Sequence, residues 1–188
     1  MRSIRSHLAA SAPYNDPQTD PPKSVFQNAI GRVVQTFKQN VELVDGHCII
    51  VRDQTELEET INRITQGKEI VRSGEVVPAR DLFNFEVGIT RAQAGIAETG
   101  TLVLDSSVER NRLVSLVPPV HIAILNASQI YATLDETLAA LQSSGELSPA
   151  ITFITGPSRT ADIELTLTVG VHGPQELYVI VNEGQTQE

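Results

Sequence analysis

Apolar and polar residues follow two different periods along the chain. From Ser24 to Phe37 the apolar residues recur every three or four positions, so they form one stripe of a predicted helix. Two more helices are predicted where a threonine stands three residues before a glutamate, a spacing typical of a capping box. These pairs are Thr55 with Glu58 and Thr133 with Glu136, and each marks the start of a helix.

Short runs of mostly apolar residues lie between these segments and favour strands that are buried on both faces. A short alanine-rich helix, capped by Thr90, is predicted between two of the runs, whereas residues 161–169 fit either a helix or a strand. The alternation of strands and helices indicates an α/β fold with a mostly parallel sheet. The predicted strands fall at residues 41–51, 69–72, 86–89, 101–105, 121–125, 150–154 and 177–181.

The first 22 residues differ from the rest of the chain. Four prolines among small polar residues in 11–22 indicate a linker, so we expect a tail and proline-rich linker at 1–22 and a single α/β domain at 23–188. No apolar run reaches the roughly 18 residues that a membrane span requires. The start of the chain lacks the apolar core of a signal peptide, so we expect a cytoplasmic protein with no membrane span.

Charge and cysteine content narrow the function classes. The net charge is −9, and lysines and arginines do not cluster, so we expect no nucleic-acid partner. The single cysteine, Cys48, is expected to be a buried thiol, and its neighbour His47 would point to the opposite face of a strand. One thiol cannot supply the roughly four ligands of an iron–sulfur cluster, and the histidines lack metal-ligand spacing. We therefore predict neither a cofactor nor a metal site in this chain.

The segment Thr155–Thr160 follows a predicted buried strand and carries a possible anion site. Gly156 permits close approach of the backbone to a ligand. If Ser158 or Thr160 caps a following helix, free N–H groups point toward the ligand, and the guanidinium of Arg159 adds a positive charge. The segment therefore indicates either a carboxylate or phosphate site or an ordinary capped turn with a surface arginine.

Acidic residues and a histidine follow this segment. Asp162 and Glu164 share one face of a strand, whereas in a helix only Asp162 shares a face with Arg159. Either acid is a candidate general base or a partner for Arg159, unless both only complement a helix dipole. His172, in a glycine-bounded loop, is a candidate for proton transfer because imidazole titrates near neutral pH. The alternative is a loop histidine that only forms hydrogen bonds.

Residues 97–101, with the sequence AETGT, form the second loop of interest. Glu98 in a crevice acts as a nucleophile or base if burial raises its pKa, whereas a turn residue only bonds neighbouring amides. Ligands of parallel sheets lie beyond the carboxyl ends of strands, so we expect this loop and residues 155–160 to meet in one pocket. His121 either points into the same crevice or is a core histidine, and the core reading is slightly favoured. Just upstream, either Arg110 or Arg112 has a side chain long enough to contact an anion.

Four segments of the second half resemble the lactate-utilisation protein C family, which carries the LUD domain. These segments are AETGTLVLD (97–105), RLVSLVPPVHIAIL (112–125), TGPSRTADIE (155–164) and GVHGPQELYVIV (170–181), in matching order and spacing. The resemblance covers about residues 84–183 well and residues 23–83 more loosely. It implies a three-layer α/β/α fold similar to the NagB/RpiA/CoA-transferase-like group.

The resemblance also implies a function. A protein of this family is expected to be a non-redox component of an L-lactate utilisation system, which oxidises lactate to pyruvate with two iron–sulfur partner proteins. Iron–sulfur clusters are then expected only in the partners, and the ligand is a small carboxylate or phosphate metabolite. The alternatives are an independent CoA-transferase-like enzyme, in which Glu98 forms an acyl anhydride or acts as a base, and a metabolite-binding module without chemistry.

The candidate site residues fall into two groups. The predicted catalytic residues are Glu98, Asp162 and His172. The predicted anion-binding residues are Thr99, Gly100, Thr101, Gly156, Ser158, Arg159 and Thr160.

Overall fold

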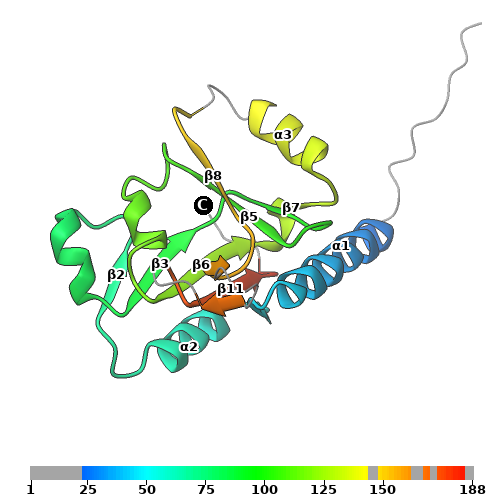
Figure 1. The fold of residues 1–188 in the computed structure, drawn as a ribbon. Coiled ribbons are helices and arrows are strands. Elements are labelled where there is room, and N and C mark those ends of the chain that lie inside the picture. Colours follow the sequence, from blue (N-terminus) through cyan, green and yellow to red (C-terminus); the bar gives the residue numbers. More distant parts are fainter. Residues whose placement is uncertain (1–22, 144–147, 162–166, 170–172, 185–188) are drawn as a thin grey trace, which may run out of the picture.

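A sheet of five parallel strands forms the centre of the molecule, in the order β1-β11-β6-β3-β2 (Figure 1). The structure is a computed structural model and describes residues 23–143, 148–161, 167–169 and 173–184. The mostly parallel α/β fold predicted from the apolar runs is confirmed. The bounds of these strands are β1 His47–Val51, β2 Ile70–Arg72, β3 Val87–Arg91, β6 Val120–Asn126 and β11 Glu176–Asn182.

Two helices cover opposite faces of this sheet. The helix α1, Lys23–Leu43, packs with Val179 of β11, whereas the helix α2, Gln54–Thr65, packs with Ile180. Because neighbouring residues of a strand point to opposite faces, this alternation separates two apolar cores. Within the described residues no helix is both long and apolar enough to cross a lipid bilayer.

A second sheet shares the face of the central sheet that α1 covers. Leu102 and Leu104 of the second sheet pack against Ala123 and Leu125 of β6, and this contact forms the core between the two sheets. The helix α3, Leu134–Ser143, packs on the outer face of the second sheet through Leu141. The strands of this sheet are β7 Ile130–Tyr131, β4 Ala94–Ile96, β5 Thr101–Asp105 and β8 Ile151–Ile154, in that order.

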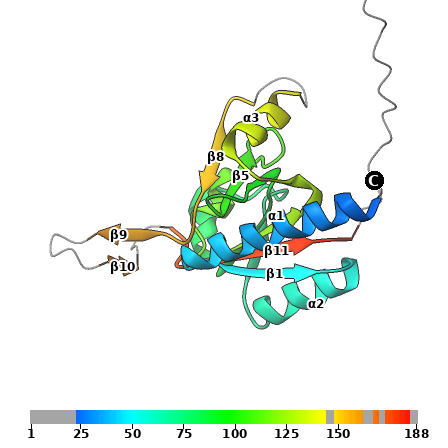
Figure 2. The ribbon, with the colours of Figure 1, turned by 90° about the vertical axis from the view of Figure 1, so that its right-hand side faces the viewer.

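Short elements complete the described part of the chain. The antiparallel strands β9 and β10 lie to one side of both sheets (Figure 2). The 3-10 helix η2 lies directly before β6 and packs on β3. The bounds of the short elements are η1 Ala79–Asn84, η2 Arg112–Ser115, η3 Ala127–Gln129, β9 Arg159–Ala161 and β10 Leu167–Val169.

The N-terminal caps of α3 and α2 can be compared with the two capping boxes predicted from the sequence. At α3 the Glu136 N–H donates to Thr133 Oγ1 at 3.3 Å, as the capping box predicts, whereas Glu136 Oε2 accepts from the N–H of Ala132, one residue before the cap, at 3.0 Å. At α2 the cap is Asp53 rather than Thr55, because Asp53 Oδ1 accepts from the Glu56 N–H at 2.9 Å.

Three of the predicted elements are wrong, each because tertiary contacts outweigh local preference. The alanine-rich segment is not a helix: it continues β3 and forms β4, which pairs with both β5 and β7. Residues 41–43 belong to α1 and not to a strand, because Val41 packs in the apolar core together with Val34 and Phe37 of the same helix. The segment after Ser158 is β9, so neither Ser158 nor Thr160 begins a helix.

The single thiol lies where the sequence predicts it. Cys48 is 4% exposed and packs in the core between α1 and the sheet, whereas His47 is exposed. Burial raises the pKa of the Cys48 thiol to about 12, so the neutral form dominates at physiological pH. Cys48 is therefore a packing residue and a poor nucleophile or metal ligand.

Candidate functional site

The two predicted loops do meet, through their threonine hydroxyls. Thr101 Oγ1 lies 2.7 Å from Thr155 Oγ1 and 2.7 Å from Thr99 Oγ1. The physical reason differs from the one predicted: β5 and β8 are antiparallel, with Leu102 opposite Ile154, so the start of one strand lies beside the end of the other. The loops therefore meet at one edge of the second sheet, and not beyond the carboxyl ends of the parallel strands.

Two glycines let both loops pack against the end of α1. Gly100 has a φ of +64°, and a Cβ there would lie 2.4 Å from the backbone N of Val41. Gly156 has a φ of +76°, and a Cβ there would lie 2.4 Å from the carbonyl oxygen of Val44. The Asn40 Nδ2 group also donates to the carbonyl of Ala97 at 2.7 Å. The C-terminal end of α1 thus fixes the backbone of both loops.

Glu98 points away from the meeting point of the loops. Its side chain is exposed, and Oε1 accepts a hydrogen bond from the Leu134 N–H at 2.9 Å. The Glu98 N–H donates to the carbonyl of Ala132 at 3.1 Å, so the residue is bonded twice to the segment that starts α3. In this structure Glu98 stabilises the first turn of a helix, where a carboxylate is also favoured by the helix dipole.

The substitutions Glu98→Gln and Glu98→Ala separate this structural role from the predicted catalytic one. Glutamine keeps an oxygen acceptor for the Leu134 N–H, so we expect little change in the free energy of unfolding. Alanine leaves that N–H without its acceptor and should lower the free energy of unfolding by about 1 kcal/mol. Chemical denaturation measures both values. A Glu98→Gln variant that folds normally but loses all activity would instead support a nucleophile or base.

Arg159 is paired with an acid outside the loops. Its guanidinium forms an ion pair with the carboxylate of Asp45, in the turn after α1, and both side chains are exposed. The Ser158 N–H donates to the carbonyl of Pro174 at 2.7 Å, which holds the loop against the segment before β11. Thr160 lies in β9, whereas Asp162 and His172 lie outside the residues that the structure describes.

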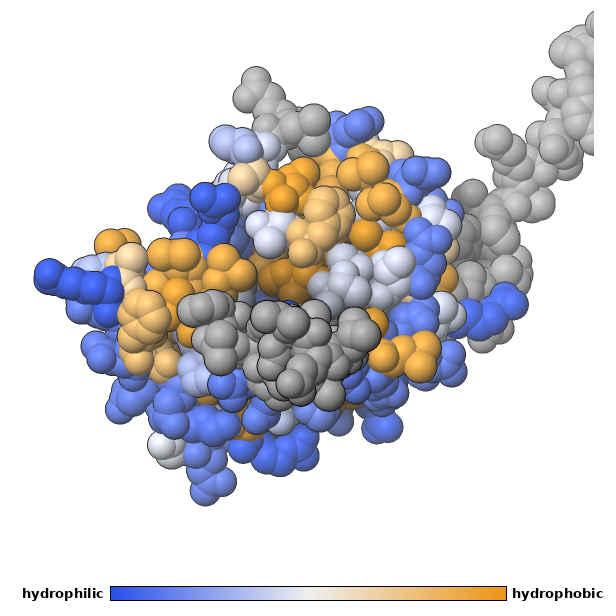
Figure 3. All heavy atoms as spheres, in the orientation of Figure 1, coloured by the Kyte–Doolittle hydropathy of each residue, from blue (hydrophilic) through white to orange (hydrophobic). Residues whose placement is uncertain are grey.

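A cavity of about 300 Å³ lies next to the loop at 155–158. Hydrophobic side chains gather on the face that carries β8 (Figure 3), and the exposed apolar residues that line the cavity are Leu116 and Phe153. Of the predicted anion-binding residues, Gly156 and Ser158 line this cavity, whereas Thr99, Gly100 and Thr101 do not, so the two loops touch without sharing this pocket. Its other lining residues are Ser115, His121, Thr152, Ile154, Thr155, Pro157, Gly173, Pro174 and Leu177.

His121 combines burial with a position on the cavity wall. It is 1% exposed, and its Nε2 lies 2.8 Å from Thr90 Oγ1, whereas Nδ1 has no hydrogen-bond partner among the described residues. Burial lowers the pKa of His121 to about 4, so the imidazole is neutral at physiological pH. The sequence favoured a core histidine, and the structure adds that this core residue lines the cavity.

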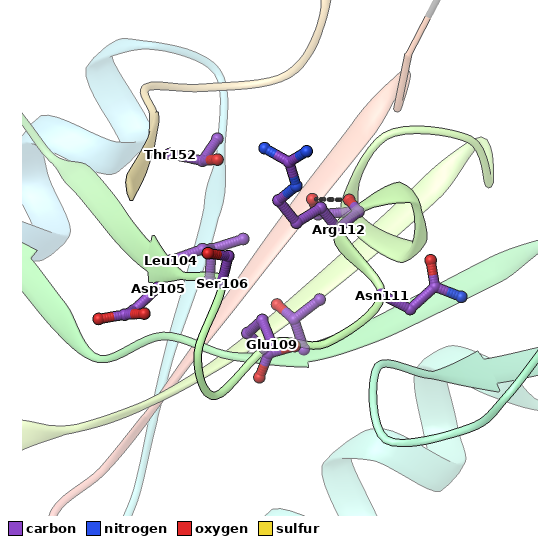
Figure 4. Close-up of a pocket in the computed structure, with 9 residues that line it drawn as sticks. Leu104, Asp105, Ser106, Glu109, Asn111, Arg112 and Thr152 are labelled. Atoms are coloured by element: carbon purple, nitrogen blue, oxygen red, sulfur yellow. Dashed lines mark hydrogen bonds between the residues drawn. The ribbon is translucent and has the colours of Figure 1, made fainter. Parts of the chain in front are cut away.

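A smaller cavity of about 10 Å³ adjoins the first, and Ser115 and Thr152 line both. Glu109 on its wall is 3% exposed: Oε1 accepts from the Arg91 N–H at 2.9 Å, and Oε2 has no partner among the described residues. Glu109 was not predicted as a site residue, because an acid in a polar loop is usually exposed. Figure 4 shows Glu109 below Ser106, Leu104 and Asp105.

Arg112 is the positive group of this region. It starts η2, and its guanidinium points toward Thr152 and away from Glu109 (Figure 4). Within the described residues it forms no ion pair. Gly88 lets η2 lie directly on β3, since a Cβ there would be 2.0 Å from the carbonyl oxygen of Val114. The arrangement places a guanidinium at one end of the paired cavities and a neutral imidazole within them.

Sequence comparison relates this chain to known proteins. The chain is 42% identical over 102 residues to the lactate utilization protein C of Shouchella clausii, and the match covers 52% of this chain and 44% of that protein. It is 32% identical over 146 residues to the lactate utilization protein C of Geobacillus kaustophilus, covering 73% of this chain and 58% of that protein. The chain thus spans about half the length of the curated relatives that it matches.

A solved structure supports the fold. The crystal structure of a DUF162 family protein from Deinococcus radiodurans matches with a TM-score of 0.65 and 23% sequence identity, over 81% of this chain and 98% of that chain. The family model of the LUD domain matches residues 77–181, which is more than half of the chain. That region contains every residue that lines either cavity, and the chain belongs to the LUD domain family.

Proposed function

We propose that the paired cavities bind a small carboxylate, and that the chain is a non-redox component of an L-lactate utilisation system. Arg112 lines the smaller cavity and His121 lines the larger one, and Ser115 and Thr152 line both. This placement is the observation that carries the proposal. A guanidinium binds a carboxylate through charge-assisted hydrogen bonds, and a neutral imidazole can bond a neighbouring hydroxyl. The names of the relatives support lactate as the metabolite.

The size and lining of the larger cavity suit a small metabolite. A volume of about 300 Å³ is at the lower end of the range for ligand sites, roughly 300–1,000 Å³. Apolar side chains of Leu116, Phe153 and Leu177 line it beside polar groups of Ser115 and Thr155. Since the net charge of the chain is −9, an anion is held only where a local positive group such as Arg112 outweighs the overall field.

The proposed partners are two iron–sulfur proteins that carry out the electron transfer. The only thiol of the chain, Cys48, is buried, and a cluster typically needs about four thiolates. No group of three or more His, Cys, Asp or Glu side chains among the described residues is arranged to hold a metal ion. In this proposal the chain binds the carboxylate, and the oxidation takes place with groups that the partners supply.

The alternative is an independent CoA-transferase-like enzyme with Glu98 as nucleophile. It has less support, because Glu98 is bonded to the Leu134 N–H and does not line either cavity. Turnover of an acyl-CoA thioester by the purified chain, lost in Glu98→Gln, would favour the alternative. Tight binding of a metabolite without any turnover or partner would favour a binding module.

Replacing Arg112 by alanine tests the proposed site. We expect the affinity for L-lactate or pyruvate to fall by about 1.5–3 kcal/mol, or roughly 10- to 150-fold, because a charge-assisted hydrogen bond is lost. Isothermal titration calorimetry measures the affinity of the wild type and the variant. Arg110→Ala is the matched control, since it removes the same charge two residues away and Arg110 does not line either cavity.

Arg159→Ala extends this test to the site predicted from the sequence. Since Arg159 is exposed and paired with Asp45, we expect its loss to leave the affinity unchanged. If Arg159→Ala abolishes binding and Arg112→Ala does not, the anion lies beside the loop at 155–160. If the wild type binds neither L-lactate, pyruvate nor inorganic phosphate, the binding proposal fails.

Growth on L-lactate tests the role in the cell. We expect a strain that lacks this chain to stop growing on L-lactate and to recover when the wild-type chain is restored. A tagged chain should also co-purify iron–sulfur proteins, which are identified by mass spectrometry and by iron content. Normal growth of the deletion strain on L-lactate, with no iron–sulfur protein recovered, would contradict the role in lactate utilisation.

A further inference from the structure

Two buried polar side chains near the cavities each have one atom without a partner. Glu109 is 3% exposed and His121 is 1% exposed, and among the described residues neither Glu109 Oε2 nor His121 Nδ1 has a hydrogen-bond partner. Leaving a buried polar atom without a partner costs about 1–3 kcal/mol, so a folded protein rarely keeps such an atom without a use. Thr90 is related to both residues, because it contacts His121 and lines the smaller cavity together with Glu109.

Thr90 lines the smaller cavity and contacts His121, which lines the larger one. Its hydroxyl is 2.8 Å from His121 Nε2, and Thr90 also lines the smaller cavity together with Glu109. A volume of about 10 Å³ is close to the space that one water molecule occupies. Oε1 of Glu109 already accepts from the Arg91 N–H, so Oε2 is the oxygen left to bind such a water.

We propose that Glu109 fixes the tautomer of His121 through Thr90 and one water molecule in the smaller cavity. A carboxylate only accepts hydrogen bonds, so the water donates to Glu109 Oε2 and accepts from the Thr90 hydroxyl. The Thr90 oxygen then accepts from His121 Nε2–H. The proton of the neutral imidazole therefore stays on Nε2, and Nδ1 keeps its lone pair.

Other charged groups near the smaller cavity do not break this chain of bonds. Asp105 also lines that cavity, but its Oδ1 accepts from the backbone N–H and the hydroxyl of Ser107, at 2.7 and 2.6 Å. The guanidinium of Arg112 points away from Glu109 (Figure 4). Thr90 and the water are thus the direct route from the carboxylate to the imidazole.

The tautomer determines which ligands the larger cavity prefers. A bare Nδ1 is able to accept a hydrogen bond from a ligand hydroxyl, whereas a keto oxygen has no proton to donate to it. A site built to bond a hydroxyl discriminates strongly against an analogue that lacks it. This consequence rests on the proposed carboxylate site, whereas the tautomer itself does not. Glu109 is then a positioning residue that acts through His121.

Nuclear magnetic resonance of the full chain labelled with ¹⁵N-histidine measures the tautomer without any ligand. We expect His121 to show a protonated Nε2 and an unprotonated Nδ1, with His121→Gln used to assign its signals. In Glu109→Gln the side chain can donate as well as accept, so the direction of the hydrogen bonds through the water and Thr90 is no longer fixed. Both nitrogen shifts should then move toward intermediate values.

Matched variants separate the proposal from a general change of structure. Thr90→Val removes the bridging hydroxyl and should change both nitrogen shifts, whereas Thr90→Ser keeps the hydroxyl and should retain the wild-type pattern. Asp105→Asn removes a charge from the same cavity and should leave His121 unchanged. A wild type protonated on Nδ1, or a folded Glu109→Gln variant with unchanged His121 shifts, would overturn the proposal.

Calorimetry with L-lactate and pyruvate then tests the ligand preference. We expect the wild type to bind L-lactate more tightly than pyruvate, and Glu109→Gln to reduce that ratio by about tenfold. An equal ratio in both proteins would overturn the role of Glu109 in selecting the ligand. If neither compound binds while the tautomer responds to Glu109→Gln, the proposed ligand is wrong and the positioning role of Glu109 stands.

Discussion

Replacing Gly100 by alanine is expected to lower the free energy of unfolding by about 2–5 kcal/mol. A residue with a side chain at a φ of +64° costs about 1–2 kcal/mol. The new Cβ would also lie 2.4 Å from the backbone N of Val41 and 2.5 Å from the backbone C of Asn40. Because these are backbone atoms inside α1, they cannot turn aside as a side chain can, and overpacking adds roughly 1–3 kcal/mol.

Gly67→Ala is the matched control for this prediction. Gly67 has a φ of +73°, but a Cβ there would meet no atom within 4 Å. Its replacement should therefore lower the free energy of unfolding only by the backbone cost of a positive φ, about 1–2 kcal/mol. Urea unfolding followed by circular dichroism measures both variants. Equal losses would show that Gly100 has no special contact with α1.

Lowering the pH from about 6.5 to about 4 is expected to remove about 3 kcal/mol of stability through His121 alone. The unfolded histidine binds a proton near its ordinary pKa of 6.5, whereas burial lowers the pKa of the folded residue to about 4. Between these values the unfolded chain binds more protons than the folded chain, so stability falls as the pH falls. The contribution is fully present above pH 6.5 and lost near pH 4.

The test compares wild type with His121→Gln, because carboxylates also titrate in this range. Glutamine does not titrate, so the variant should show a shallower decrease in the free energy of unfolding between pH 6.5 and 4. The control is His47→Gln, which replaces an exposed histidine in the same way. If His121→Gln and wild type lose stability in parallel, His121 does not resist protonation in the folded protein.

The strands of the central sheet were predictable because parallel strands buried on both faces require continuous apolar runs. Segments such as 121–125 and 177–181 carry that pattern, and both lie in strands of the central sheet. In the second sheet, β5 and β8 match the strands predicted at 101–105 and 150–154, whereas β4 was not predicted because it reads locally as a helix of alanines. Its conformation comes from pairing with β5 and β7 and from Gly95, which packs closely against Phe37.

The candidate site was predicted in part. A glycine and a serine after a buried strand pointed to the loop that holds Gly156 and Ser158, and this loop does line the larger cavity. Glu98 looked equally promising, but its neighbours in sequence do not reveal that it faces the Leu134 N–H, 36 residues away. Burial of His121 and Glu109 depends on two sheets that close over them, which no local pattern records.

The end of α1 supports both loops, through Asn40, Val41, Val44 and Asp45. This helix lies before residues 77–181, which the family model matches. A polypeptide trimmed to that match would keep every cavity-lining side chain and lose the helix end that supports the loops at 97–101 and 155–158. The smallest unit that folds with an intact cavity is therefore larger than the stretch that sequence comparison outlines.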